Sequence, residues 1–292
     1  MTGSSKAAYP TVAPARRDEI AELAEAVAAE HAKPGRVDPY AVLASQHITC
    51  SCGDYADAFD GMLELKGNKF HVYCNLARVE HRSSTRARFT IGHELGHFFI
   101  DDHRQGILAG GMSRHPSFCE FESKNVVEYE ADLFASSMLM PRQWFVHKTK
   151  ACSKGLGGIL ALANHFGVSL TSAAIRYADL EVLPCIVIKW SADGYAWKWL
   201  SKTARYGKYF NNIRSLADVP NDAATARIAS GQKPPPGMAY MENGSTAAAW
   251  YKSVAGGSFR DVMLMEQAIS LGRFGVLTFL YPLEGGFPDL RA

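Results

Sequence analysis

Hydrophobic residues recur at helical spacing in several segments of this sequence. Within Asp18–Ala32 the apolar positions lie three or four residues apart and predict an amphipathic helix. Arg86–Ile100 runs without proline behind the capping residues Ser83–Thr85, and Val126–Met140 is mostly small and apolar before Pro141. Both segments are therefore predicted to be helices, and the second is predicted to be buried.

Alternating apolar and polar residues predict strands elsewhere. Gly61–Leu65 and Phe70–Cys74 flank a turn and predict a β-hairpin. The hairpin is either part of the core or has an exposed edge that is a candidate template for an extended peptide. Further along, Cys185–Trp190 and Tyr195–Trp199 predict a second hairpin, and Phe274–Tyr281 predicts a buried strand. The predicted fold class is α+β.

These segments divide the chain into predicted domains. Residues 1–14 form a loose tail, residues 15–150 form the first domain, and residues 184–292 form a smaller C-terminal α+β domain that is a candidate sensory or regulatory module. Residues 151–183 contain two helices around a turn, Gly157–Phe166 and Ser169–Leu180, in a helix-turn-helix-like arrangement. The second of these helices carries one positive charge over Ser169–Tyr177, so we expect the pair to pack on the first domain and not to bind DNA.

The motif His93-Glu94-Leu95-Gly96-His97 lies inside the first of the two central helices. Two histidines four positions apart share one face of a helix and are able to bind one divalent metal ion. The glutamate between them then lies beside the open coordination position of the metal, where it acts as a general base. Gly96 is unfavourable in a helix interior and indicates a close approach, either functional or between two helices.

A zinc site of this kind needs a third protein ligand. Glu128 and Asp132 are four positions apart on the second helix, so Glu128 is predicted to reach the metal while Asp132 accepts a hydrogen bond from a ligand histidine. Glu130 points about 160° away on a regular helix and is read as facing solvent or another helix, although a different register would make it the ligand. His103 occupies the third-histidine position of an extended motif, but Ile100 replaces the glycine that this motif requires.

The segment Arg88–His97, followed by Glu128–Pro141, resembles the ImmA/IrrE family of metallo-endopeptidases over approximately residues 60–179. The resemblance implies a zincin-like domain with one Zn²⁺ bound by His93, His97 and Glu128, and with Glu94 as the catalytic base. It also implies a partner: family members are intracellular, gluzincin-like proteases that cleave a helix-turn-helix repressor and thereby switch on genes of mobile elements or of the DNA-damage response. Imidazole and carboxylate ligands suit zinc, and Mn²⁺ or Fe²⁺ fits the same set.

Two classes of function follow from these residues. The first is a zinc endopeptidase, in which a metal-activated water attacks the peptide and Glu94 takes up its proton. The second is a regulator without proteolysis, which binds a repressor or a small ligand and keeps the metal site as a structural or vestigial feature. The presence of Glu94 favours the first class, because a structural site needs no general base.

Composition limits the cellular setting. The net charge of +2 over 292 residues gives no indication of a nucleic-acid or membrane partner, and the start of the chain has no pattern of a secretion signal. The six cysteines are scattered and are expected to be reduced thiols. We therefore predict a cytoplasmic protein. Five aromatic residues of its C-terminal domain are expected to be core residues rather than a ligand or partner surface: Trp190, Trp197, Trp199, Trp250 and Tyr251.

Overall fold

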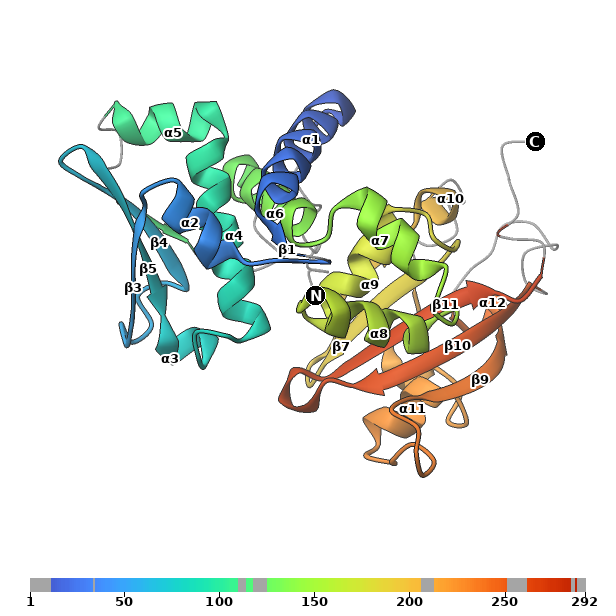
Figure 1. Ribbon diagram of the computed structural model, residues 1–292. Coiled ribbons are helices and arrows are strands. Elements are labelled where there is room, and N and C mark those ends of the chain that lie inside the picture. The colour runs from blue at the N-terminus through green and yellow to red at the C-terminus, as the bar shows by residue number, and fades with distance from the viewer. Residues whose placement is uncertain are drawn as a thin grey trace. The chain divides into compact units, whose positions relative to one another are not determined.

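The computed structural model folds the chain into two compact units (Figure 1), and it describes residues 12–33, 35–109, 114–117, 125–205, 213–250, 262–284 and 287. The first unit comprises Met1–Phe145 and Asn164–Ser169, and the second comprises Val146–Ala163 and Leu170–Ala292. Both units contain helices and a sheet, so the predicted α+β class is confirmed. The domain boundaries at residues 150 and 183 remain predictions, and most of the predicted tail lies outside the described residues.

The first unit begins with α1, which starts four residues before the predicted Asp18. Its elements are α1 (Pro14–His31), β1 (Ala32–Lys33), β2 (Arg36–Val37), α2 (Pro39–Ser45), β3 (Thr49–Gly53), β4 (Gly61–Lys66), β5 (Lys69–Asn75), α3 (Leu76–Val79), α4 (Thr85–Phe99), α5 (Asp101–Leu108), β6 (Arg114–Ser117), α6 (Val126–Leu139) and the first part of α7 (Arg142–Thr149). The predicted hairpin is present as β4 and β5, and the two central helices are present as α4 and α6.

The sheet of the first unit has the strand order β3-β5-β4-β6. β3 pairs in parallel with β5, and β6 pairs antiparallel with β4 from Gly61 opposite Ser117 to Glu64 opposite Arg114. Both hairpin strands therefore have neighbours on both sides. The hypothesis that an exposed edge of this hairpin binds a peptide is wrong, because β3 and β6 cover its two edges, and the hairpin lies inside the sheet as the alternative interpretation expected.

α4 lies between this sheet and α6 in the first unit (Figure 1). A methyl group at Gly96 would lie 3.0 Å from the Cα atom of Ala131, and one at Gly92 would lie 3.2 Å from the Cβ atom of Ala135. These two glycines therefore let α4 approach the small residues of α6 more closely than larger residues would allow. The close approach inferred for Gly96 is helix–helix packing, and it brings α6 near enough to α4 for their polar residues to meet.

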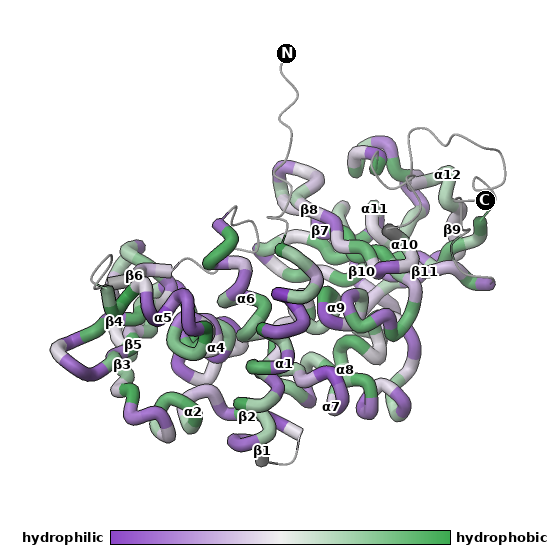
Figure 2. Tube along the Cα trace, turned by 90° about the horizontal axis from the view of Figure 1, so that it is seen from above, coloured by the Kyte–Doolittle hydropathy of each residue, from purple (hydrophilic) through white to green (hydrophobic). Residues whose placement is uncertain are grey.

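The second unit is built on a five-stranded antiparallel sheet with the order β8-β7-β11-β10-β9. Its elements after α7 are α8 (Leu156–Phe166, which ends in the first unit), α9 (Leu170–Asp179), β7 (Ile186–Ser191), β8 (Gly194–Leu200), α10 (Lys202–Arg205), η2 (Leu216–Asp218), α11 (Ala224–Ala229), β9 (Met241–Thr246), α12 (Ala247–Trp250), β10 (Met263–Ser270), η4 (Gly272–Phe274) and β11 (Val276–Pro282). β7 and β11 are largely hydrophobic along their length (Figure 2). The second predicted hairpin and the late buried strand are both present.

Tryptophans fill the core of the second unit, as predicted. Trp190 and Trp250 are at most 1 % exposed, and Trp197 and Trp199 are each 8 % exposed. The indole nitrogen of Trp190 donates a hydrogen bond to Thr278, and that of Trp199 donates one to Asp179. These contacts satisfy the polar groups of the two rings, so these tryptophans are core residues, whereas Tyr251 lies outside the described residues.

The predicted pair of helices is present as α8 and α9, bent by 111° at their junction. Residues Ser172–Ala178 of α9 are all buried, and α9 packs on β7 and β8. A DNA-recognition helix needs an exposed face, so this burial argues against DNA binding through α9. None of the described helices is by itself long and apolar enough to cross a membrane; only α8 and α9 taken together have that length and composition.

Candidate metal centre

α4 presents the histidines of the motif on one buried face. The helix begins at Ser84, whose hydroxyl accepts a hydrogen bond from the backbone N–H of Ala87 at 3.0 Å. His93 and His97 are each 1 % exposed, and Glu94 between them is fully buried. Such burial of polar groups is unfavourable unless they have partners, so these side chains belong to an internal polar site and not to a solvated helix face.

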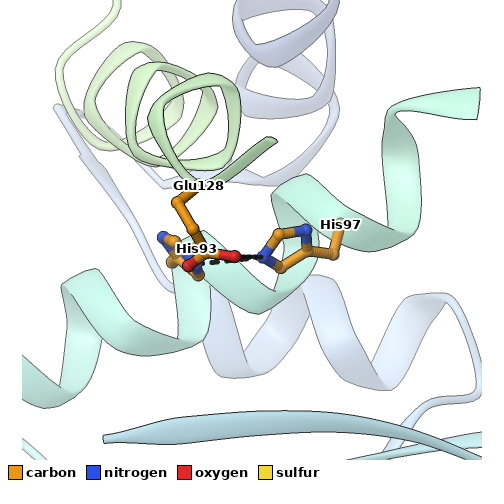
Figure 3. Close-up of side chains that lie close together, drawn as sticks. All are labelled: His93, His97 and Glu128. Atoms are coloured by element: carbon orange, nitrogen blue, oxygen red, sulfur yellow. Dashed lines mark hydrogen bonds and ion pairs between the residues drawn. The ribbon is translucent and has the colours of Figure 1, made fainter. Parts of the chain in front are cut away.

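Glu128 extends from α6 towards both histidines (Figure 3). The two Nε2 atoms of His93 and His97 are 3.0 Å apart, and the Glu128 oxygens lie 3.2 Å from His93 Nε2 and 3.7 Å from His97 Nε2. Two ligands of a tetrahedral zinc ion at 2.0–2.1 Å are about 3.3 Å apart. The shorter distance is to Glu128 Oε2 and the longer to Glu128 Oε1, so the carboxylate faces both histidines at separations close to those between zinc ligands. The residues present therefore fit the metal that the resemblance implies.

His93 also contacts Asp132 on the side facing away from Glu128. Its Nδ1 atom lies 2.8 Å from Asp132 Oδ1, which places the carboxylate where it is able to orient the ring. Burial lowers the pKa of His93, but the hydrogen bonds to Asp132 and Glu128 outweigh this and raise the pKa above its usual value. A proton and a metal ion therefore compete for His93. Spacing alone predicted this position of Asp132.

His97 has a different neighbour behind it. Its Nδ1 atom lies 3.3 Å from Nδ1 of His103, and His103 Nε2 lies 3.1 Å from a Glu130 oxygen. Arg16 of α1 contacts both oxygens of Glu130, at 3.2 and 3.0 Å. His103 is therefore on the opposite side of His97 from Glu128, outside the donor cluster.

Glu130 is 7 % exposed, so the part of its interpretation that placed it in solvent is wrong. The other part, which paired Glu130 with another helix, agrees with its contact with Arg16 of α1. The sequence reasoning did not find Arg16, because nothing near that residue in the chain indicates a buried partner. Its partner lies 114 positions away.

Glu94 is placed by the start of β4. A methyl group at Gly61 would lie 2.5 Å from Glu94 Oε1 and 2.5 Å from Thr90 Cγ2, so the absence of a side chain at Gly61 makes room for the carboxylate. The preceding residue, Asp60, is fully buried and contacts Arg78 and Arg86. These contacts hold the start of β4 beside α4, and the hairpin pattern in the sequence gives no indication of them.

Comparison with known families matches residues 76–177 to the IrrE N-terminal-like domain of the peptidase M78 family. Among solved structures, a protein described as a Mycobacterium tuberculosis transcriptional regulator is similar in fold, with a TM-score of 0.58 and 14 % sequence identity over 92 % of this chain and 90 % of that one. No curated protein matches the chain. The matched residues contain the donor histidines and Glu128, so residues 76–177 are similar to the IrrE N-terminal-like domain, which supports the resemblance to ImmA/IrrE metallopeptidases.

Proposed function

We propose that the chain is a zinc-dependent endopeptidase that hydrolyses a peptide bond in an intracellular protein. The observation that carries this proposal is the cluster of His93, His97 and Glu128, whose donor atoms all lie within 4.8 Å of one another. A bound zinc ion supplies a Lewis acid there, which makes water a nucleophile near neutral pH and stabilises the oxyanion that forms. The residues of the chain hold the ligands in place and move the proton.

Each polar residue then has one task. His93, His97 and Glu128 are the metal ligands, and Asp132 holds the His93 ring in the orientation that points Nε2 into the cluster. Glu94 accepts a proton from the attacking water and returns it to the leaving amine. Its full burial lowers the local dielectric, which strengthens its interaction with the developing charges.

A purely structural metal site is the competing function, and the donor set argues against it. Structural zinc sites normally have four protein ligands, whereas the described residues bring together three. His103 does not complete the set, because it lies near Nδ1 of His97 and not near Nε2. Three ligands and a neighbouring glutamate are the arrangement that hydrolysis requires.

The substrate that we propose is a helix-turn-helix transcriptional repressor. This assignment rests on the match of residues 76–177 to the IrrE N-terminal-like domain and on the burial of α9, which disfavours a direct role of the chain on DNA. The similar structure described as a transcriptional regulator is compatible with such a partner. The test substrate is a helix-turn-helix repressor encoded beside this protein.

The decisive experiment compares Glu94→Gln with Glu22→Gln, an exposed glutamate on α1. Glu94→Gln should retain zinc and lose cleavage by at least about a hundredfold, because general-base catalysis contributes roughly 10²–10⁴-fold. His93→Ala should instead lose the metal, and Glu22→Gln should behave as the wild type. Cleavage is followed by electrophoresis and the metal by elemental analysis, which also identifies zinc, manganese or iron. An active Glu94→Gln protein would refute the mechanism.

A further inference from the structure

A second polar site lies in the first unit, around a pocket of about 800 Å³ at the N-terminal end of α4. The pocket is lined by Arg36, Val37, Asp38, Tyr40, His81, Arg82, Ser83 and Arg88. Its volume is within the range of small-molecule sites. No residue of the proposed metal centre lines it, so it needs a separate explanation.

Three arginines from different parts of the unit meet at this pocket. Arg36 comes from β2, Arg82 from the loop before α4, and Arg88 from α4 itself. None of the three forms a salt bridge with a carboxylate of the described residues at 4.0 Å or less. Asp38 also lines the pocket, so three positive charges face one negative charge and leave a formal excess of +2.

Arg88 is the buried member of this group. It is 7 % exposed, and it donates hydrogen bonds to the carbonyl oxygens of Val37 at 2.7 Å and Gly167 at 2.9 Å. Burial and the nearby charge of Arg36 lower the pKa of Arg88 to about 10, so the guanidinium remains charged at neutral pH while the two like charges repel. An anion between the arginines would remove this repulsion.

Arg82 and Tyr40 shape the other wall of the pocket. The Arg82 guanidinium lies 4.4 Å from the centre of the Tyr40 ring, and the Tyr40 hydroxyl donates a hydrogen bond to the Arg82 carbonyl oxygen at 2.9 Å. The ring contact holds the Arg82 side chain at the pocket, the hydrogen bond fixes Tyr40 to the backbone of Arg82, and the ring provides an apolar surface beside the charges. The N-terminal end of α4 adds a partial positive charge at Ser83.

We propose that this pocket binds a small molecule carrying a phosphate group. A carboxylate is planar and is satisfied by one guanidinium, whereas a phosphate is tetrahedral, carries up to two charges and accepts hydrogen bonds from several sides. Three arginines on different elements suit the phosphate. The partly exposed ring of Tyr40 is suited to contact the organic part of a phosphate ester.

The experiment uses the full chain with inorganic phosphate and adenosine monophosphate as probes, and calorimetric titration at constant ionic strength as the measurement. Arg36→Gln and Arg82→Gln are the test variants, since Arg88 also donates hydrogen bonds to three backbone carbonyls and its replacement would disturb folding. Arg142→Gln is the matched control, because Arg142 is an exposed arginine outside the pocket. Thermal unfolding of each variant checks that it is folded.

We expect the wild type and Arg142→Gln to bind a probe with the same affinity, and each test variant to bind it about 10–100-fold more weakly, the range for a lost hydrogen bond to a charged group. Tighter binding of adenosine monophosphate than of inorganic phosphate would show that the apolar wall takes part, and equal binding would assign the site to the phosphate group alone. The proposal is overturned if the wild type binds neither probe at millimolar concentration. It is also overturned if the test variants bind as well as the control, or if only duplex DNA binds.

Discussion

Replacing Gly61 with alanine should destabilise the protein, although alanine is normally favourable at such a position. Gly61 lies in a strand and has no positive φ, so the backbone admits alanine there. Glycine in a strand interior is usually worse than alanine by roughly 0.5–1 kcal/mol. The new methyl group, however, would lie 2.5 Å from both Glu94 Oε1 and Thr90 Cγ2, where carbon atoms normally stay beyond 3.4 Å. Either β4 or the Glu94 carboxylate must therefore move by up to an ångström.

Overpacking of this kind destabilises a core by about 1–3 kcal/mol, which corresponds to a fall of roughly 2–12 °C in the unfolding midpoint. A shift of about 1 Å in a catalytic group lowers activity by as much as about a hundredfold. Gly61→Ala should therefore unfold earlier and cleave more slowly while it keeps its metal. Calorimetry, metal analysis and the repressor cleavage assay measure these three properties.

Gly244→Ala is the matched control, because Gly244 also lies in a strand, has no positive φ, and a methyl group there meets no atom within 4 Å. That variant should be neutral or slightly stabilised. The double variant Gly61→Ala with Glu94→Ala should recover part of the lost stability, because the contact with the carboxylate is removed. If Gly61→Ala were as stable and active as Gly244→Ala, the inferred placement of Glu94 against β4 would be wrong.

Three further predictions concern the partners of the site. Glu130→Gln should weaken metal binding about 10–100-fold, because it weakens the contact that positions His103 against the Nδ1 atom of His97. Competition with a chelator measures the metal affinity, and an unchanged affinity would refute this role of Glu130. Removing the metal should lower the unfolding midpoint of the wild type but not of His93→Ala, since an ion that binds the folded chain stabilises it; equal midpoints of the wild type with and without chelator would count against a bound ion. Burial raises the pKa of Asp60, but the contacts with Arg78 and Arg86 outweigh it and lower the pKa in the folded protein. The stability that the ionised Asp60 contributes is therefore complete above pH about 4, the pKa of the unfolded chain, and is lost as the pH falls through the lower pKa of the folded protein. The urea concentration at the unfolding midpoint should then fall more steeply with decreasing pH in the wild type than in Asp60→Asn.

The central helices were predictable because their evidence is local. The capping residues Ser83–Thr85 indicated the start of α4, and Pro141 indicated the end of α6. The helical spacing within α6 then placed Glu128 and Asp132 on one face. The structure brings both side chains to His93. The partners of Glu130 were not predictable, because Arg16 and His103 lie 114 and 27 positions away and a helical pattern gives no information on distant pairs.

β10 was missed for a different reason. Its sequence contains Glu266 and Gln267 in the middle of the strand, and these residues suggest an exposed segment. Both are buried, because Glu266 accepts a hydrogen bond from the backbone N–H of Thr225 and Gln267 accepts one from that of Leu156. Buried polar side chains that satisfy backbone groups elsewhere look like surface residues in a sequence, so such strands are systematically hard to find.

The path of the chain between Phe145 and Leu170 has a practical consequence. The chain leaves the first unit after Phe145, returns to it for Asn164–Ser169, and then leaves it again. A fragment that stops at residue 150 would lack Gly167, whose carbonyl oxygen accepts a hydrogen bond from the buried Arg88 of α4. Neither half can therefore be cut out by a single scission, and a protease nick between them should leave two pieces that stay unfolded when separated.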